Sequence, residues 1–121
     1  MIKRKPDWQI HLNKYIAEVQ SKKFKYGKWD CCHFGAGAIK AITGSDLMKE
    51  YRGKYKSKKE AMEILDKKPL FEILKEKLGE PVPAAQAKRG DLAFHEGRVG
   101  IIIGRYAIFL TDEGYHQLSI Q

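Results

Sequence analysis

The chain has 121 residues, enough for one domain with a hydrophobic core, and shows no repeat or low-complexity tract. No apolar run approaches the length of a membrane span, and no apolar signal-peptide core follows the basic N-terminus, so we expect neither a span nor a signal peptide. The two cysteines are adjacent and the histidines are scattered, which excludes a disulfide framework and a zinc-finger spacing. We expect no metal and no cofactor.

The positive charge lies in the first half of the chain. Residues 1–60 hold 15 Lys or Arg and 6 Asp or Glu, a net charge of +9, whereas residues 61–121 have a net charge of −1. A basic half suits an acidic partner such as nucleic acid, anionic lipid or a teichoic-type polymer. The lysines are spread over several predicted elements without a recognition motif, which favours a solvated surface over a nucleic-acid partner.

Two helices are predicted in the first third. An apolar stripe at helical spacing predicts an amphipathic helix over residues 7–22, formed by Trp8, Leu12, Ile16 and Val19. A second helix is expected over residues 31–42, with Asp30 as its N-cap and Gly44 as its C-terminal stop. Its many small residues let other backbone pack closely, so we expect this helix to be buried.

The middle third predicts two shorter helices. Ser57 and Glu60 form a capping box, and the expected core face of this third helix consists of Met62, Ile64 and Leu65. A fourth helix is expected from about Pro69 to Leu78. Residues 81–85, with two prolines, are expected to form an extended connector.

The last third changes to the period-two pattern of strands. Strands are expected over residues 91–95, 98–103, 106–110 and 115–120, with a two-residue turn at Glu96-Gly97. Helices followed by an antiparallel meander indicate an α+β fold. We therefore expect a single domain over residues 1–121, with a helical part at about 7–79 and a sheet at about 90–121.

The adjacent cysteines admit two interpretations. A thiol in the first turn of a helix lies at the positive end of the helix dipole, which favours the thiolate, and Cys31 would then be a nucleophile. Alternatively, Cys31 and Cys32 are both small core residues, because free cysteine is among the most buried residue types.

Two segments carry a resemblance to a known family. Tyr26-Gly27-Lys28-Trp29-Asp30-Cys31-Cys32 resembles the Asp-Cys-Ser nucleophile motif of the NlpC-type cell-wall cysteine peptidases. Residues 89–94 and 99–104 resemble that family's Gly-Asp-Leu strand and its His-Val-Gly-Ile strand. The resemblance implies a papain-like fold, with N-terminal helices packed on a small antiparallel sheet. Residues 32–44 and 51–55 also resemble a compact phage and prophage subgroup, whose members lie among tail-assembly proteins.

The chain departs from the family at Arg98, which stands where the catalytic histidine precedes Val-Gly-Ile. Arginine stays protonated and cannot serve as a general base. The two-residue turn would place His95 directly opposite Arg98 and on the same face of the sheet, so we expect His95 to be the candidate base. The family's third polar group would fall near Leu110 or Thr111, of which only Thr111 is polar.

The resemblance leaves two functions open. In the first, a phage-tail enzyme hydrolyses amide bonds of peptidoglycan: Cys31 attacks, His95 transfers protons, and Asp30, Trp29 and Arg98 support the site. The oxyanion would be held by the Cys31 backbone N–H and by a donor from the Trp29 loop. In the second, the catalytic set has decayed. The domain is then a structural or assembly protein of the virion tail, binding tail proteins through its basic half and through exposed Tyr51 and Tyr55. The expected location is the virion tail or the host cytoplasm.

Overall fold

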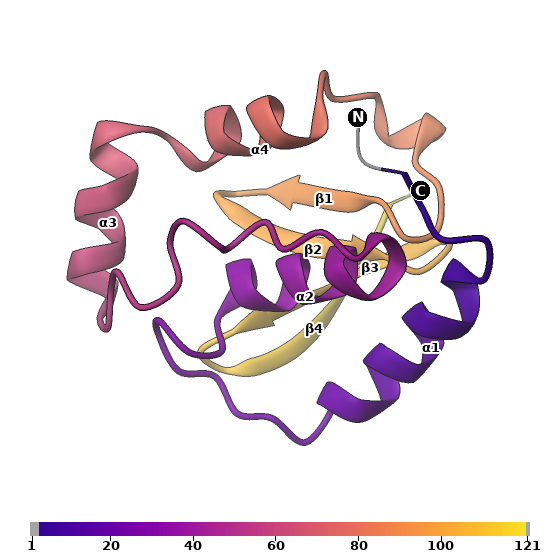
Figure 1. The fold of residues 1–121 in the computed structure, drawn as a ribbon, viewed down its shortest axis with the longest axis horizontal. Helices are drawn as coiled ribbons and strands as arrows, with labels where there is room; N and C mark the ends of the chain where they lie inside the picture. Colours follow the sequence, from indigo (N-terminus) through magenta and orange to yellow (C-terminus); the bar gives the residue numbers. More distant parts are fainter. Residues whose placement is uncertain (1–2, 121) are drawn as a thin grey trace.

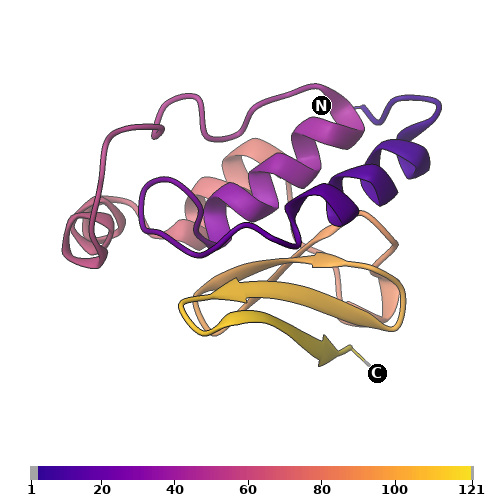
Figure 2. The same cartoon turned by 90° about the horizontal axis from the view of Figure 1, so that it is seen from below.

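The computed structural model describes residues 3–120, which fold into two layers. Helices lie on one side and a four-stranded sheet on the other, as Figure 2 shows. The first helices are α1 (Trp8–Val19) and α2 (Cys31–Thr43), and α2 runs through the centre of the molecule (Figure 1). Helix α1 ends three residues before the predicted boundary at 22.

Helix α2 has the ends that the sequence predicted. The Asp30 side chain accepts a hydrogen bond from the backbone N–H of His33, and Gly44 adopts a left-handed conformation with φ of 87°. A Cβ atom at Gly35 would lie 2.6 Å from Cγ1 of Val99, so the glycine allows the helix to approach the sheet closely. This contact positions the first turn of α2 beside the second strand.

The sheet is an antiparallel meander of β1 (Leu92–His95), β2 (Arg98–Ile102), β3 (Tyr106–Thr111) and β4 (Gly114–Ser119), in that order. Each strand lies within about one residue of its predicted bounds. Glu96 and Gly97 both have positive φ, at 50° and 77°, which is the type I′ geometry of a two-residue hairpin. The register therefore pairs His95 with Arg98, as predicted.

Two short helices, α3 (Lys58–Lys67) and α4 (Leu70–Leu78), lie along one side of α2 and β1 (Figure 1). The capping box holds, because Ser57 Oγ accepts from the Glu60 N–H at 3.2 Å. The expected core face of α3 is wrong at Met62, whose exposed fraction is 50%. The connector is not wholly extended: Ala84–Gln86 forms a single 3-10 turn, since Pro83 provides a φ of −59° at its start.

The main core lies between α1, α2 and the inner face of the sheet. Its fully buried side chains include Leu12, Phe34, Ile42, Ile101 and Leu110. Because side chains alternate along a strand, a second cluster of Ile102, Ala107 and Phe109 lies on the outer face of the sheet. Within residues 3–120, no helix is both long enough and apolar enough to cross a membrane. The α+β class is confirmed.

Candidate active site

Cys31 is the first residue of α2, and its thiol is partly buried against the start of β2. A hydrogen bond from the Cys32 thiol lowers the pKa of Cys31 and exceeds the opposing effect of burial. The Val99 backbone N–H and the positive charge of Arg98 act in the same direction as Cys32, and the pKa of Cys31 falls to about 7. The sequence analysis pointed to the helix terminus, whereas the largest influence on the pKa of Cys31 is the neighbouring thiol.

Cys32 behaves oppositely. Its hydrogen bond to Cys31, together with burial, raises the pKa of Cys32 well above its ordinary value. Its side chain is partly buried and packs beside the small cluster of Ala36, Met48 and Tyr55. The adjacent thiols are therefore distinct, and Cys31 is the one that ionises near neutral pH.

A buried hydrogen-bond network surrounds Asp30, whose exposed fraction is 4%. Oδ1 accepts from the His33 N–H at 3.0 Å and from His33 Nδ1 at 2.8 Å. Oδ2 accepts from the Gly27 N–H at 3.1 Å and from the Tyr55 hydroxyl at 2.5 Å. Burial alone would raise the pKa of Asp30, but the bonds from His33 and Tyr55 together lower it to about 2. Asp30 is therefore a fixed anion that caps α2.

This network corrects the expectation that Tyr55 is exposed, and it brings His33 and Tyr55 to the site beside Asp30. Tyr55 is not an exposed aromatic, because its exposed fraction is 7% and its hydroxyl reaches Asp30. Gly27 has a φ of 81°, and a Cβ there would lie 2.0 Å from the Tyr55 carbonyl oxygen, so the two loops are in close contact. The position of His33, three residues after a capping Asp, was a usable local signal. Nothing local predicts the position of Tyr55.

Arg98 and His95 share one face of the sheet, as predicted, and it is the outer face. In the alternation of side chains along the strands, both residues are on the same face as Ile102 and Phe109. That face is opposite the one that packs on α2. The His95 ring lies 6.3 Å from the Phe109 ring, its Nε2 is 3.8 Å from Glu96 Oε1, and its side chain is 53% exposed. The register thus brings Arg98 into the electrostatic surroundings of Cys31 and turns His95 toward Glu96 and Phe109.

Trp29 supports the loop that precedes Cys31. Its indole N–H donates to the Tyr115 hydroxyl at 3.0 Å, which in turn donates to the Val19 carbonyl at 2.7 Å. The Lys22 ammonium lies 4.3 Å from the centre of the Trp29 ring. Because the indole N–H already donates to Tyr115, the indole is not the donor to an oxyanion that was expected from this loop.

Tyr26, on the same loop, is a donor that the sequence interpretation did not name. Burial raises the pKa of Tyr26, and the charges of Asp112 and Cys31 raise it further, while Arg98 opposes them. The Tyr26 hydroxyl therefore stays protonated and lies in the electrostatic surroundings of Cys31.

The strand positions expected for a third polar group do not supply one. Leu110 is 1% exposed and belongs to the core. Thr111 uses its hydroxyl within its own turn, accepting from the Glu113 N–H at 3.2 Å and donating to the Gly114 carbonyl at 3.3 Å. Within residues 3–120, no group of three or more His, Cys, Asp or Glu side chains is arranged to hold a metal ion.

Comparison with known proteins gives one result for this chain. Residues 3–121 match the model of a family described as a domain of unknown function, DUF6950. The chain belongs to that family. No curated protein and no solved structure matches it. The DUF6950 match spans both the helical layer and the sheet, so the Asp30–Cys31 turn and the Arg98 hairpin lie within one family domain.

Proposed function

We propose that this protein is a catalytically decayed NlpC-like domain of a phage or prophage tail, retained for tail structure or assembly. The observation that carries the proposal is the position of the two candidate bases. Arg98 stands where the peptidase motif has histidine, and the 53% exposed His95 side chain lies beside Glu96 and Phe109 on the outer face of the sheet. Amide hydrolysis by a thiol needs a group that gives a proton to the leaving amine, and arginine cannot give one near neutral pH.

Three of the four histidines support this view. His33 is buried and bonded to Asp30, and His11 bonds to Asp7 at 3.1 Å. His95 contacts Glu96 and Phe109 on the outer face of the sheet. These contacts support the view that the domain lacks a proton-transferring residue beside the Cys31 thiol.

The catalytic part of the proposal is tested by restoring the histidine. Arg98→His places an imidazole at the position that the peptidase motif gives to the base. We expect the natural protein to leave purified peptidoglycan and model dipeptides intact, and Arg98→His to gain measurable cleavage. The double variant Arg98→His/Cys31→Ser should lose that gain, and Arg105→His, outside the site, is the matched control.

The structural part is tested in particles. A tail component should be found in purified virions by mass spectrometry and should co-purify with neighbouring tail proteins. Exposed apolar side chains, including Ile10 at 68% and Val82 at 58%, suit such contacts. A freely diffusing monomer that is absent from particles would contradict this role.

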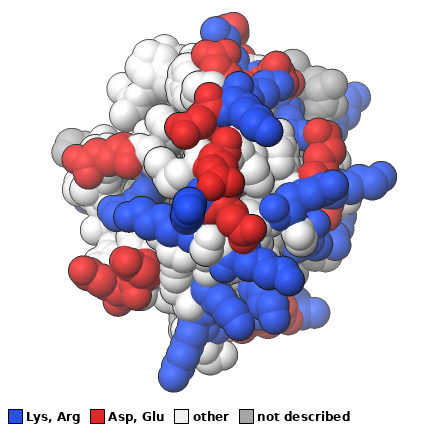
Figure 3. All heavy atoms as spheres, turned by 90° about the vertical axis from the view of Figure 1, so that its left-hand side faces the viewer, with Lys and Arg blue, Asp and Glu red and all other residues white. Residues whose placement is uncertain are grey.

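A nucleic-acid role is less well supported. Figure 3 shows acidic side chains among the basic ones on the face that carries α3, so the positive charge there is interrupted. Titration with duplex DNA at two salt concentrations tests this point. Strong binding that weakens with salt would favour the nucleic-acid role.

A second candidate function is hydrolysis of peptidoglycan amide bonds by the protein as it stands. It is favoured by the pKa of Cys31, about 7, which provides thiolate near neutral pH. Cys31 would attack the amide carbonyl to form a thioester, with the oxyanion held by its own N–H and the Tyr26 hydroxyl. His95, after turning from Glu96, would protonate the departing amine and then activate water. Cleavage by the natural protein that Cys31→Ser and His95→Ala both abolish would establish this function.

A further inference from the structure

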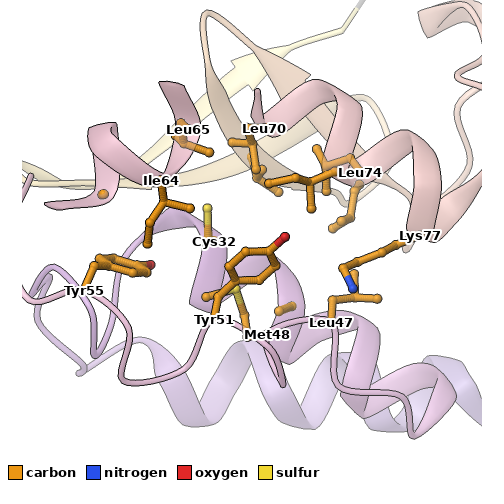
Figure 4. Close-up of a pocket in the computed structure, with 15 residues that line it drawn as sticks. Cys32, Leu47, Met48, Tyr51, Tyr55, Ile64, Leu65, Leu70, Leu74 and Lys77 are labelled. Carbon is orange, nitrogen blue, oxygen red and sulfur yellow. The ribbon is translucent and has the colours of Figure 1, made fainter. Parts of the chain in front are cut away.

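The two edges of the sheet differ in what lies beside them. The β1 edge is flanked by α4, because the Phe71 ring lies 5.5 Å from the Phe94 ring and Leu74 lines the same small pocket as Leu92 (Figure 4). Strand β4 is the last strand in the order of the sheet, and it pairs with β3 alone. In Figure 2 no helix of residues 3–120 lies beyond β4. Strand β4 is therefore an open edge.

Alternate residues of β4 direct their backbone groups to this edge. The Ile120 N–H donates to the Arg105 carbonyl at 3.0 Å, in the register of the β3–β4 ladder, and hydrogen-bonded pairs recur at every second residue of an antiparallel ladder. The even-numbered residues of β4 therefore bond to β3. The N–H and C=O groups of Tyr115 and Gln117 point away from β3, toward the open edge.

Strand β4 lacks the features that usually keep sheet edges apart. Edge strands in natural proteins commonly carry lysine, proline or a bulge, each of which hinders pairing with another chain. The sequence of β4 is Gly-Tyr-His-Gln-Leu-Ser, with no Lys, Arg or Pro, and its pairing with β3 is continuous over residues 114–119. An extended strand can therefore add to this edge through backbone hydrogen bonds.

The two ends of the edge carry opposite charges. Asp112 and Glu113 form the turn before β4, and Arg105 lies beside Ile120 at the other end. All three charged side chains are exposed, and in the described part of the chain none of them takes part in an ion pair. An antiparallel copy of the same strand brings the acidic end beside the basic end, so the edge is complementary to itself.

We propose that β4 pairs with β4 of a second copy of this chain, antiparallel and about a two-fold axis at His116. Tyr115 then faces Gln117 of the partner subunit, and the two residues exchange N–H···O=C hydrogen bonds on each side of the axis. The two sheets become one continuous antiparallel sheet. The Asp112–Glu113 turn lies near Arg105 of the partner subunit.

This dimer is weak, because one short strand pair buries little surface and each copy has a net charge of +8. We expect a reversible monomer–dimer equilibrium with a Kd on the order of 0.1 mM, measured by sedimentation of the full chain at physiological ionic strength. Amide chemical shifts should depend on concentration in β4 and not in β1. The proposal goes beyond the tail role and does not depend on it, because the purified chain alone is tested.

A proline at the edge separates backbone pairing from side-chain contact. Gln117→Pro removes an N–H that points away from β3, so the β3–β4 ladder is kept. The matched control Gln117→Thr changes the side chain and keeps that N–H. We expect Gln117→Pro to raise the dimer Kd about tenfold or more, and Gln117→Thr to change it by less than about threefold. Thermal unfolding of each variant separates loss of pairing from loss of fold.

Charge reversal tests the antiparallel arrangement without altering the backbone. Arg105→Glu and Asp112→Lys each place like charges together across the axis and should weaken the dimer. The double variant restores the attraction and should return the Kd to within about threefold of the natural value. Lys49→Glu changes an exposed residue outside the sheet and controls for the change in net charge that Arg105→Glu makes.

The proposal is overturned if the natural chain stays monomeric up to about 1 mM, in which case the edge is left to a strand of another protein. It is also overturned if folded Gln117→Pro dimerises as the natural chain does, or if the concentration-dependent shifts lie outside β4. Should Gln117→Pro not fold, the charge variants decide: a double variant as weak as Arg105→Glu would contradict the antiparallel pairing.

Discussion

The thiols of Cys31 and Cys32 differ in acidity because one donates its hydrogen bond to the other. Charge then stays on Cys31, at the end of α2 where backbone N–H groups are unpaired and the helix dipole is positive. The lowered pKa of Cys31 thus favours its thiolate near neutral pH.

The first prediction follows from this difference in acidity. The rate of iodoacetamide alkylation at Cys31 should rise as pH increases through about 7, the pKa of its thiol, and level off above it. Cys32 should react slowly over the same range, and Arg98→Ala should move the Cys31 midpoint upward. Site assignment by mass spectrometry provides the measurement. Equally slow labelling of both thiols until the protein unfolds would contradict the assignment.

Asp30 makes folding sensitive to acid. Its pKa in the folded chain, about 2, lies below the ordinary value of 3.8, so the carboxylate stabilises the fold above about pH 4 and this contribution is lost as pH falls toward 2. The contribution is about 2 kcal/mol. Urea unfolding at pH 7 and at pH 3 should show about half of this loss in the natural protein, because pH 3 lies between the folded and ordinary pKa values, and Asp30→Asn should show much less of it. An unchanged pH dependence in Asp30→Asn would assign the effect to other carboxylates.

Tyr55 is the long-range partner of that carboxylate. Tyr55→Phe removes the 2.5 Å hydrogen bond to Asp30 and should cost about 1–3 kcal/mol of unfolding free energy. Tyr51→Phe removes a hydroxyl from a half-buried tyrosine outside the network and should cost little. Equal effects of the two variants in urea unfolding would mean that the Asp30 bond adds nothing.

At the scale of elements, the close approach of α2 to β2 determines where Cys31 lies. Gly35→Ala places a Cβ atom 2.6 Å from Val99 Cγ1 and 3.5 Å from Leu92 Cδ2, and overpacking of this kind costs about 1–3 kcal/mol. Val99→Ala removes the clashing methyl group. The double variant should therefore lose less stability than the sum of the two single variants, as measured by urea unfolding. Additive losses would show that the helix and strand adjust independently.

The β1–β2 hairpin determines the face of the sheet on which both candidate side chains lie. The type I′ turn fixes His95 opposite Arg98, and alternation then places both on the outer face with Phe109. Arg98 is long enough for its charge to act on Cys31 from there.

At the scale of the whole molecule, burial is uneven. The core between α1, α2 and the sheet contains the fully buried Leu12, Phe34 and Ile101, whereas α3 contributes no fully buried residue. We expect backbone amides of α3 and α4 to exchange with deuterium through local opening, well before those of α2 and β2, which require global unfolding. Exchange at one common rate in all four elements would show that the helical pair is an integral part of the core.

Much of the fold is set by local physics that the sequence displays. The caps at Asp30, Ser57 and Gly44 are formed by neighbours a few residues apart, and the Glu96-Gly97 turn fixes its own register. For the same reason the α+β order and the pairing of His95 with Arg98 could be predicted. The papain-like assignment and the tail function stay predictions that rest on resemblance.

The tertiary structure decided what depends on packing between distant segments. Tyr55 reaches Asp30 across 25 residues of sequence. Met62 is exposed because α3 turns Ile64, instead of Met62, toward the cluster that contains Tyr55. Whether the His95 ring faces α2 or points away from it depends on which face of the sheet α2 covers. The period-two pattern predicts which residues share a face, but it does not predict which face packs against the helix. The acidity of Cys31 likewise required the positions of Cys32, Val99 and Arg98 relative to one sulfur atom.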